Sequence, residues 1–251
     1  MSDTTNAVLD TEAQPISSAK EGIKVDEKKV EEMFKAGVQF ACSRTTRHPK
    51  MKKYLAGIKN NVEIFDLGLT FQELEKAKEF IKKLGAEGKT VLFVGTKVEA
   101  NEAIKKAAGE LSMPYVTERW LGGILTNYKA LKGRVDYLMS QKQKKAMGEL
   151  AKYTKKEQSL MDKEMTKMSR FLEGLEISKE MPAALVVVDP KKEAIAIKEA
   201  QRNHIPVVAI ANSDCNPLPV DYIIPANDSS VTSIGYILNE LAKAYRRVEG
   251  N

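Results

Sequence analysis

Two patterns of apolar positions alternate along the chain: runs of strand length, and stripes with the period of a helix. Helical stripes occupy 26–36, 70–85, 96–111, 190–203 and 230–247. Apolar runs lie between the stripes, at Val62–Phe65, Thr90–Val94, Pro114–Thr117, Ala184–Val188, Pro206–Ile210 and Tyr222–Ile224. Unbroken apolar runs are typical of strands buried on both faces. Strands that alternate with helices predict βαβ units and a doubly wound parallel sheet, so the fold class is α/β.

Three capping boxes and two glycines predict where helices begin and end. Thr-x-x-Glu occurs at Thr70, Thr96 and Thr154, and this spacing lets a threonine and a glutamate satisfy the first amides of a helix. Gly37 and Gly85 follow helical stripes and predict helix ends.

The alternation is interrupted between residues 124 and 176 by two heptad stripes. Their apolar positions are spaced 4, 3, 4, 3, which predicts two arms of an antiparallel coiled-coil hairpin inserted into the sheet domain. In the alternative, both arms pack flat on the sheet. The arms consist of Ile124, Tyr128, Leu131, Val135 and Leu138, and of Met161, Met165, Met168, Leu172 and Leu175.

These patterns divide the chain into four parts. Residues 1–25 form a flexible acidic tail, and residues 26–123 form the first part of the α/β domain, with a basic loop at 42–59. Residues 124–176 form the hairpin, and residues 177–251 complete the α/β domain.

Positive charge is concentrated in two segments, although the net charge of the 251 residues is only +6. Residues 44–59 contain six bases and no acid, and residues 129–170 contain twelve bases and five acids. Clustered Lys and Arg are typical of a polyanion-binding surface. In the helical segment, a solvated helix surface is the alternative.

Other properties of the sequence restrict the class of protein. No apolar run reaches the roughly 18 residues of a membrane span, and the N-terminus lacks the pattern of a secretory signal. Cys42 and Cys215 are the only cysteines, so a disulfide framework is excluded. We therefore expect a cytoplasmic protein without a membrane partner.

No motif for catalysis or for a cofactor accompanies the α/β pattern. Gly85 and Gly88 have two intervening residues instead of the four of a phosphate loop, and they precede a strand. Gly-x-Gly-x-x-Gly, Gly-x-Ser-x-Gly and His-Glu-x-x-His are absent. Two options for a site remain. One is a nucleophile–base pair of Cys42 and His48, and the other is a metal site formed by these two residues with His204 and Cys215. We predict no enzyme, cofactor, metal or small-molecule substrate; a nucleotide-binding α/β enzyme is the alternative.

Four strings stand out along the chain: Pro49–Met51, Val94–Lys97, Arg119–Gly123 with Leu125–Tyr128, and Pro182–Asp189 continuing through Glu193, Ile197 and Glu199 to His204–Pro206. In this order they resemble the second protein of the small ribosomal subunit in its bacterial form, the universal ribosomal protein two family. The resemblance extends from about Met33 to Arg246. One departure is Gln39-Phe40-Ala41-Cys42, where the family usually has His-Phe-Gly-His, so a role of those histidines does not carry over.

This resemblance implies a flavodoxin-like parallel sheet with a coiled-coil insertion. It also implies a non-catalytic, structural constituent of the 30S subunit that binds small-subunit (16S) rRNA and supports translation in the cytoplasm. Neighbouring small-subunit proteins, including the large mRNA-capturing protein, are the implied protein partners.

Charge and resemblance together give the candidate RNA-binding residues. In the basic loop, bases meet phosphate and two threonines offer hydroxyls. Before the hairpin, Gly122 and Gly123 allow a sharp turn, and Trp120 either stacks on a base or acts as a structural wedge. The lysines at the tip of the hairpin, where the two arms are connected, either contact phosphate or form a solubilising turn. The residues are Arg44, Thr45, Thr46, Arg47, Lys50, Lys52, Lys53, Arg119, Trp120, Lys129, Lys132, Arg134, Lys142, Lys144 and Lys145.

Overall fold

A five-stranded parallel sheet forms the centre of the protein in the computed structural model, which describes residues 26–149, 153–178 and 180–246. The tail expected at 1–25 lies outside these residues. The sheet order is β5-β4-β6-β7-β8, which is 2-1-3-4-5 when counted from its first strand. The predicted mixed α/β fold is therefore confirmed. The strands are β4 Val91–Val94, β5 Tyr115–Val116, β6 Ala184–Val188, β7 Val207–Ala211 and β8 Tyr222–Pro225.

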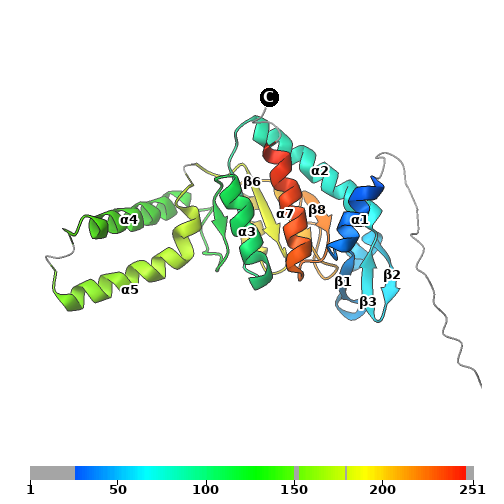
Figure 1. The fold of residues 1–251 in the computed structure, drawn as a ribbon, viewed down its shortest axis with the longest axis horizontal. Helices are drawn as coiled ribbons and strands as arrows, with labels where there is room; N and C mark the ends of the chain where they lie inside the picture. The colour runs from blue at the N-terminus through cyan, green and yellow to red at the C-terminus, as the bar shows by residue number, and fades with distance from the viewer. Residues whose placement is uncertain (1–25, 150–152, 179, 247–251) are drawn as a thin grey trace, which may run out of the picture.

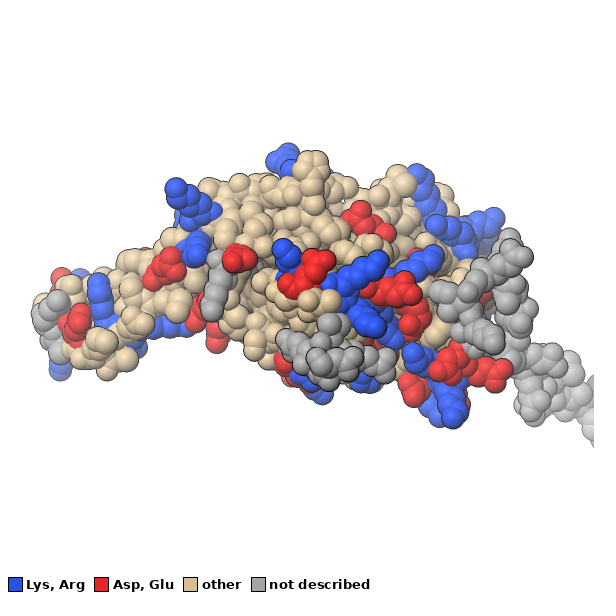
Figure 2. Space-filling view, turned by 90° about the horizontal axis from the view of Figure 1, so that it is seen from above, with Lys and Arg blue, Asp and Glu red and all other residues tan. Residues whose placement is uncertain are grey.

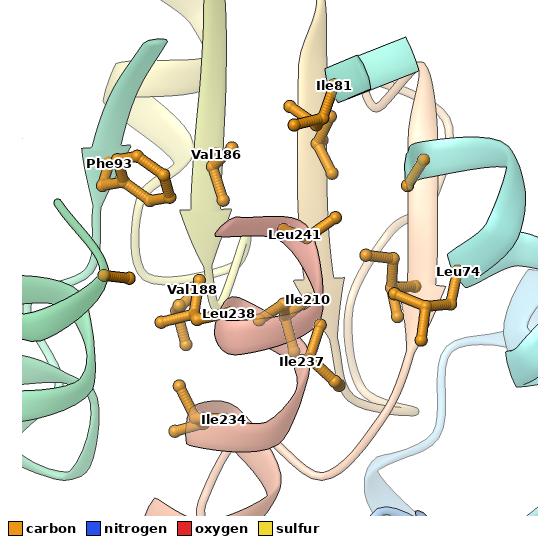
Figure 3. Close-up of a cluster of buried hydrophobic side chains, with 14 of the residues drawn as sticks. Leu74, Ile81, Phe93, Val186, Val188, Ile210, Ile234, Ile237, Leu238 and Leu241 are labelled. Atoms are coloured by element: carbon orange, nitrogen blue, oxygen red, sulfur yellow. The ribbon is translucent and has the colours of Figure 1, made fainter. Parts of the chain in front are cut away.

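One face of the sheet is covered by α2 (Leu67–Ala86), α3 (Val98–Glu110) and α7 (Val231–Arg246) (Figure 1). Figure 3 shows the side chains of α7 and α2 directed at those of the strands. Burial of such aliphatic side chains stabilises the fold by about 1.5–3 kcal/mol each. The labelled residues of this cluster are Leu74, Ile81, Phe93, Val186, Val188, Ile210, Ile234, Ile237, Leu238 and Leu241.

The other face is covered by α6 (Ala194–Arg202) and by the segments that flank α4 and α5. The strands alternate between the two faces, since Val186 and Val188 point to one side and Leu185 and Val187 to the other. All four are buried, as the unbroken apolar run of β6 predicts.

A second, smaller sheet was not predicted. Val62–Phe65 is a strand, β3, but it pairs antiparallel with β1 (Phe40–Ser43) and β2 (Leu55–Lys59) and takes no part in the parallel sheet. The helix α1 (Glu27–Lys35) precedes it, is capped by Asp26 and ends before Gly37, whose φ is +74°. The prediction for this helix is confirmed.

Two long helices, α4 (Tyr128–Ala146) and α5 (Lys155–Leu172), lie side by side beyond the sheet in Figure 1. A short 3-10 turn, Glu173–Leu175, follows α5. Most of the predicted seam residues lie in one cluster with the sheet face: Ile124, Val135, Leu138, Leu172 and Leu175 are buried, and Leu131, Met165 and Met168 pack against them.

The seam is open towards the ends of α4 and α5 that lie away from the sheet. A cavity there is lined by Tyr137, Met161 and Met165 among others. The first arm also begins later than predicted, because Ile124 lies in a turn and α4 starts at Tyr128. The hydroxyl of Tyr128 donates to the carbonyl oxygen of Ser178 at 3.2 Å. This bond joins the start of α4 to the segment that follows α5.

Of the three capping boxes, only Thr154 is confirmed: both hydrogen bonds between Thr154 and Glu157 are present. The other two are wrong, because each threonine has a distant partner. Thr70 lies inside α2, which Asp66 caps, and donates to the carbonyl of Pro225 at 2.8 Å. Thr96 precedes α3 and donates to Glu193 at 2.6 Å.

The predicted start of α6 is also wrong, whereas α2 ends at Ala86, one residue after the predicted end, although Gly85 is not the residue that ends it. Gly85 lies within α2, and a Cβ there would be 2.5 Å from the carbonyl oxygen of Tyr245, so this glycine lets α2 and α7 approach closely. Asp189 has a φ of +64° and accepts bonds from the amides of Lys191 and Lys192. This turn delays α6 until Ala194.

Candidate nucleic-acid interface

The basic loop expected at 42–59 is shorter in the structure, because Cys42 and Ser43 end β1 and Leu55–Lys59 form β2. Between these strands it consists mainly of two 3-10 segments, Arg44–Thr46 and Pro49–Tyr54. Met51 and Tyr54 are buried, and their spacing of three matches one turn of a 3-10 helix. The residues between and beside them therefore point outwards. Lys50, Lys52 and Lys53 are exposed as a result.

The loop is fixed to the segment that follows the carboxyl end of β7, and it also packs on β8. Met51 and Tyr54 pack in one cluster with Cys215 and Ile223. The amide of His48 donates to the carbonyl of Ser213 at 2.8 Å. The bases of the loop thus project from a rigid support, which reduces the entropy lost when they bind a partner.

Four of the loop's five predicted bases have no acidic partner among the described residues. Arg44, Lys50 and Lys52 are exposed, and the Lys53 ammonium lies 4.6 Å from the centre of the Tyr54 ring. An ammonium over an aromatic face retains its charge and its outward position. These side chains can still bind an anion.

Arg47 differs from the other bases, because it pairs with an acid that lies outside residues 44–59. Its guanidinium donates to Oε1 of Glu63 at 2.8 Å. The Glu63 side chain is only 1% exposed, so Arg47 neutralises a buried carboxylate. This contact assigns Arg47 a structural role within the small sheet.

The two threonines of the loop are exposed, but their hydroxyls already have partners. Thr46 Oγ1 donates to the carbonyl of Ser43 at 2.9 Å, and Thr45 Oγ1 lies 3.2 Å from the Ser43 hydroxyl. Either oxygen can still accept a bond, for example from a ribose hydroxyl.

Trp120 is buried, which favours the structural wedge over the alternative in which it stacks on a base. Its Nε1 donates to Glu199 of α6 at 3.2 Å. The same carboxylate accepts bonds from the amides of Gly123, Leu125 and Thr126 at 2.7–3.2 Å. Arg119, next to the indole, is exposed.

Glu199 therefore organises the turn that leads into α4. Burial raises the pKa of its carboxyl, but the bonds from Gly123, Leu125, Trp120 and Thr126 outweigh burial and hold the pKa below its usual value. Gly123 has a φ of +97°, as expected for a sharp turn, whereas Gly122 has open space around its Cα. In the sequence, Glu199 is only one residue of a string that resembles the family, and no local pattern indicates this role.

The bases of α4 do not form one surface. Lys129, Arg134 and Lys144 are exposed, but they lie on different sides of the helix. Lys132 is exposed and interacts with another group of the protein. The net charge of this helix is therefore distributed around its circumference.

Two of the three tip lysines pair with acids, which the sequence did not predict. Lys142 lies 2.6 Å from Glu176, and Lys145 lies 2.8 Å from Asp162. Both lysines and Asp162 are partly exposed, and such pairs stabilise a protein by about 1 kcal/mol or less. Lys142 and Lys145 thus remain available to a stronger partner, but their charge is partly neutralised.

The crevice at the carboxyl ends of β4 and β6, where sheets of this order bind ligands, is filled by the protein itself. The ammonium of Lys97 lies 2.7 Å from Asp228 and 2.9 Å from Asp189. Burial lowers the pKa of Lys97, but both carboxylates outweigh this and raise it. Asn212 links Asp228 to the amide of Cys42 and so joins the two sheets. The amides of Gly95 and Thr96, which directly follow β4, donate to the carbonyl of Val116 and to Glu193.

The cysteines do not form the sites considered above. Burial, together with the charges of Asp214 and Asp228, raises the pKa of Cys42 to about 11, so its thiol stays protonated and is a poor nucleophile. Asp189, Cys215 and Asp228 offer ligand atoms within 4.8 Å of one another. Lys97 already pairs with both of these carboxylates, so it supplies the charge that a metal ion would bring.

Both signs of charge lie next to one another over the body of the protein in the view from above (Figure 2). The Lys78 ammonium, for example, lies between Glu75 and Glu240, at 2.7 and 3.2 Å. Positive side chains without an acidic partner among the described residues are therefore found in particular segments, such as the basic loop, and not evenly over the surface. None of the described helices is long and apolar enough to cross a membrane.

Fold and site together define a class: an α/β protein whose ligand crevice is closed by its own side chains and whose basic loop is held outwards. Comparison with known sequences specifies the class further. The profile of the family described as "Ribosomal protein S2" matches residues 33–248. The chain belongs to this family. Its role is structural, in the small ribosomal subunit, and it is not an enzyme.

Curated relatives carry the name "Small ribosomal subunit protein uS2". Those of two strains of Thermus thermophilus are 42% identical over 210 residues, which cover 84% of this chain and 82% of theirs. That of Spiroplasma citri is 44% identical over 215 residues, covering 86% of this chain. The match spans 60% of the Spiroplasma protein.

Proposed function

We propose that the chain is a structural constituent of the 30S subunit that binds 16S rRNA through its basic loop and through the helices α4 and α5. It acts in the cytoplasm, where it supports translation. One observation carries this proposal: Arg44, Lys50, Lys52 and Lys53 project from a segment that is anchored by buried Met51 and Tyr54. Positive side chains without acids, held on a rigid support, suit a sugar–phosphate backbone.

The helices α4 and α5 form the second part of the proposal. We regard residues 124–176 as an inserted coiled-coil hairpin in a flavodoxin-like domain made of residues 26–123 and 177–251. The support is the position of α4 and α5 between β5 and β6 in the chain, with no sheet strand among the described residues between them. A hairpin beyond the sheet brings its bases to RNA that the loop does not reach.

Protein neighbours complete the proposal. The family resemblance implies contacts with other proteins of the small subunit, among them the large mRNA-capturing protein. Exposed apolar side chains on the small sheet and on α1, such as Phe34 and Phe40, are 60% and 48% exposed. Clustered apolar side chains of this kind are typical of protein contacts.

Ribosome co-sedimentation tests the proposal. The tagged chain is expressed in a bacterium, and the lysate is separated on a sucrose gradient at low magnesium, which dissociates the subunits, and at high salt, which removes loosely bound protein. We expect the chain in the small-subunit peak, and its loss from that peak when Arg44, Lys50 and Lys52 are all replaced by Gln. Recovery of the unchanged chain at the top of the gradient would refute the proposal.

A further inference from the structure

The bases of α5 form an ordered surface that differs from those of α4. With 3.6 residues per turn, Lys156, Lys163, Lys167 and Arg170 lie within about 60° of one another around the helix. All four are exposed. From Lys156 to Lys167 this row extends about 16 Å along the helix. We call these four residues the α5 row.

The α5 row faces away from the sheet-side seam. Met161, Met165, Met168 and Leu172 lie within about 60° of one another, and the centre of this stripe is about 160° from that of the row. Leu172 is buried, and Met165 and Met168 pack against the same cluster. Packing of the seam therefore fixes the direction of the row.

The acids of α5 do not neutralise the row. The helix α5 contains three acids. Glu157 is engaged in the N-terminal cap with Thr154, Asp162 pairs with Lys145 of α4, and Glu164 is exposed and forms no ion pair with the described residues. Lys156, Lys163 and Lys167 form no ion pair with any acid of the described residues. Arg170 pairs with Glu118 of the body at 2.8 Å, which ties this face of α5 to the domain.

The surface along the row is also hollowed. A shallow groove is lined by four bases and one acid, Asp162, which pairs with Lys145. The Ser159 hydroxyl forms no hydrogen bond with the described residues, so it can donate to a phosphate oxygen. Bases that outnumber acids along a groove suit the negative charge of a nucleic-acid backbone. The lining residues are Lys155, Gln158, Ser159, Asp162, Lys163, Thr166, Lys167, Arg170 and Phe171.

We propose that the outer face of α5, and not α4 or the tip, is the RNA-contacting surface of the α4–α5 pair, and that Lys156, Lys163 and Lys167 each neutralise a phosphate. This inference rests on the proposed function and specifies which residues of the pair perform it. It departs from the sequence, which favoured the bases of α4 and the tip.

Two variants with equal loss of charge test the inference. One carries Lys156→Gln, Lys163→Gln and Lys167→Gln in the full chain; the other carries Lys129→Gln, Arg134→Gln and Lys144→Gln. Affinity for 16S rRNA is measured by filter retention over a range of salt concentrations. For the α5 variant, we expect about tenfold weaker binding and a slope of log affinity against log salt that is shallower by roughly two units. For the α4 variant, we expect less than a twofold change.

A third variant with Lys156→Arg, Lys163→Arg and Lys167→Arg keeps the charges and should bind like the unchanged chain. Thermal unfolding should be the same for all, because these side chains are exposed. An equal or larger loss in the α4 variant, or an unchanged slope in both, overturns the inference. An unchanged slope together with loss from the small-subunit peak would mean that α5 faces a protein. Failure of the unchanged chain to bind 16S rRNA would instead refute the proposed function.

Discussion

The indole Nε1 of Trp120 and the carboxylate of Glu199 are joined by a hydrogen bond of 3.2 Å, although 79 positions separate the two residues in the chain. Glu199 lies on α6, and Trp120 begins the turn that leads into α4. One buried carboxylate thus sets the direction in which a helix pair leaves the sheet. A buried residue can therefore determine where the helices that we propose to bind RNA are held.

Replacement of Glu199 by Gln should destabilise the fold. The amide NH₂ would replace one of the two carboxylate oxygens and would face either the N–H of Gly123, which donates to Oε1, or the N–H of Leu125, which donates to Oε2, so that one donor would lose its acceptor. We expect a loss of about 2–4 kcal/mol in the free energy of unfolding, measured by urea denaturation at neutral pH. Glu102→Gln, on the exposed surface of α3, is the control and should change it by less than about 0.5 kcal/mol.

The effect of Glu199 should depend on pH. Because its folded-state pKa lies below the unfolded value of about 4.3, its contribution is complete above that value and is lost as pH falls through the folded pKa. The difference between the unchanged chain and Glu199→Gln should therefore be constant near neutral pH and shrink below about pH 4. A difference that grows on acidification would contradict the network.

Trp120 is the only tryptophan, so its fluorescence reports on this turn alone. Since the indole is only 7% exposed, we expect blue-shifted emission and weak quenching by iodide in the free protein. Addition of 16S rRNA should leave both unchanged. Strong quenching at saturating RNA would show that the indole leaves its pocket and stacks on a base.

Arg47→Gln should affect the stability of the free protein, in contrast to changes at other loop bases. It would leave the Glu63 carboxylate buried without its partner; Oε2 of Glu63 already accepts no hydrogen bond from the described residues. We expect a loss of about 2–4 kcal/mol in unfolding free energy. Arg44→Gln should cost less than about 0.5 kcal/mol.

The second change Glu63→Gln in the Arg47→Gln background should recover part of that loss, because it removes the buried charge. Equal stability of Arg47→Gln and Arg44→Gln would mean that the ion pair contributes nothing to the fold.

A pair of deletions should show where the helix pair ends and the sheet core begins. Replacing 129–171 by a Gly-Ser linker of about ten residues keeps Ile124, Leu172 and Leu175, which pack on the sheet, so unfolding should stay cooperative. Extending the deletion to 124–175 removes these side chains and should cost several kcal/mol, since each large aliphatic truncation costs about 2–5 kcal/mol. Thermal denaturation, monitored by circular dichroism, distinguishes the two deletion variants. Loss of cooperativity in the shorter deletion would assign α4 and α5 to the core.

The sequence was sufficient to predict β4, β6 and β7, because strands buried on both faces are continuously apolar. It was insufficient for β1 and β2, which are short and mostly exposed on the small sheet. Capping boxes were reliable only where no tertiary partner competed: Thr154 is exposed, whereas Thr70 reaches Pro225. Tertiary contact overrode the local signal in that case.

The candidate interface, like the fold, was predicted only in part from the sequence. Lys50 and Lys52 are exposed as expected, since charge density and the buried Met51 are both local features of the sequence. The partners of Arg47 and Lys142 lie 16 and 34 positions away, and no local pattern reveals them. Glu199 gave no signal of its own because a lone glutamate in a helix is usually a solvated residue.

The salt dependence of RNA binding by the loop tests the central claim most directly. In the variant with Arg44→Gln, Lys50→Gln and Lys52→Gln, three of the proposed phosphate contacts are removed and no ion pair among the described residues is broken. The control carries Lys82→Gln, Lys105→Gln and Lys106→Gln, which remove equal charge from exposed positions on α2 and α3. Filter retention with 16S rRNA should give weaker binding for the loop variant and a log–log salt slope shallower by roughly two to three units, with little change for the control. Equal slopes for the unchanged chain and the loop variant, or an equal decrease in the control, would contradict the account.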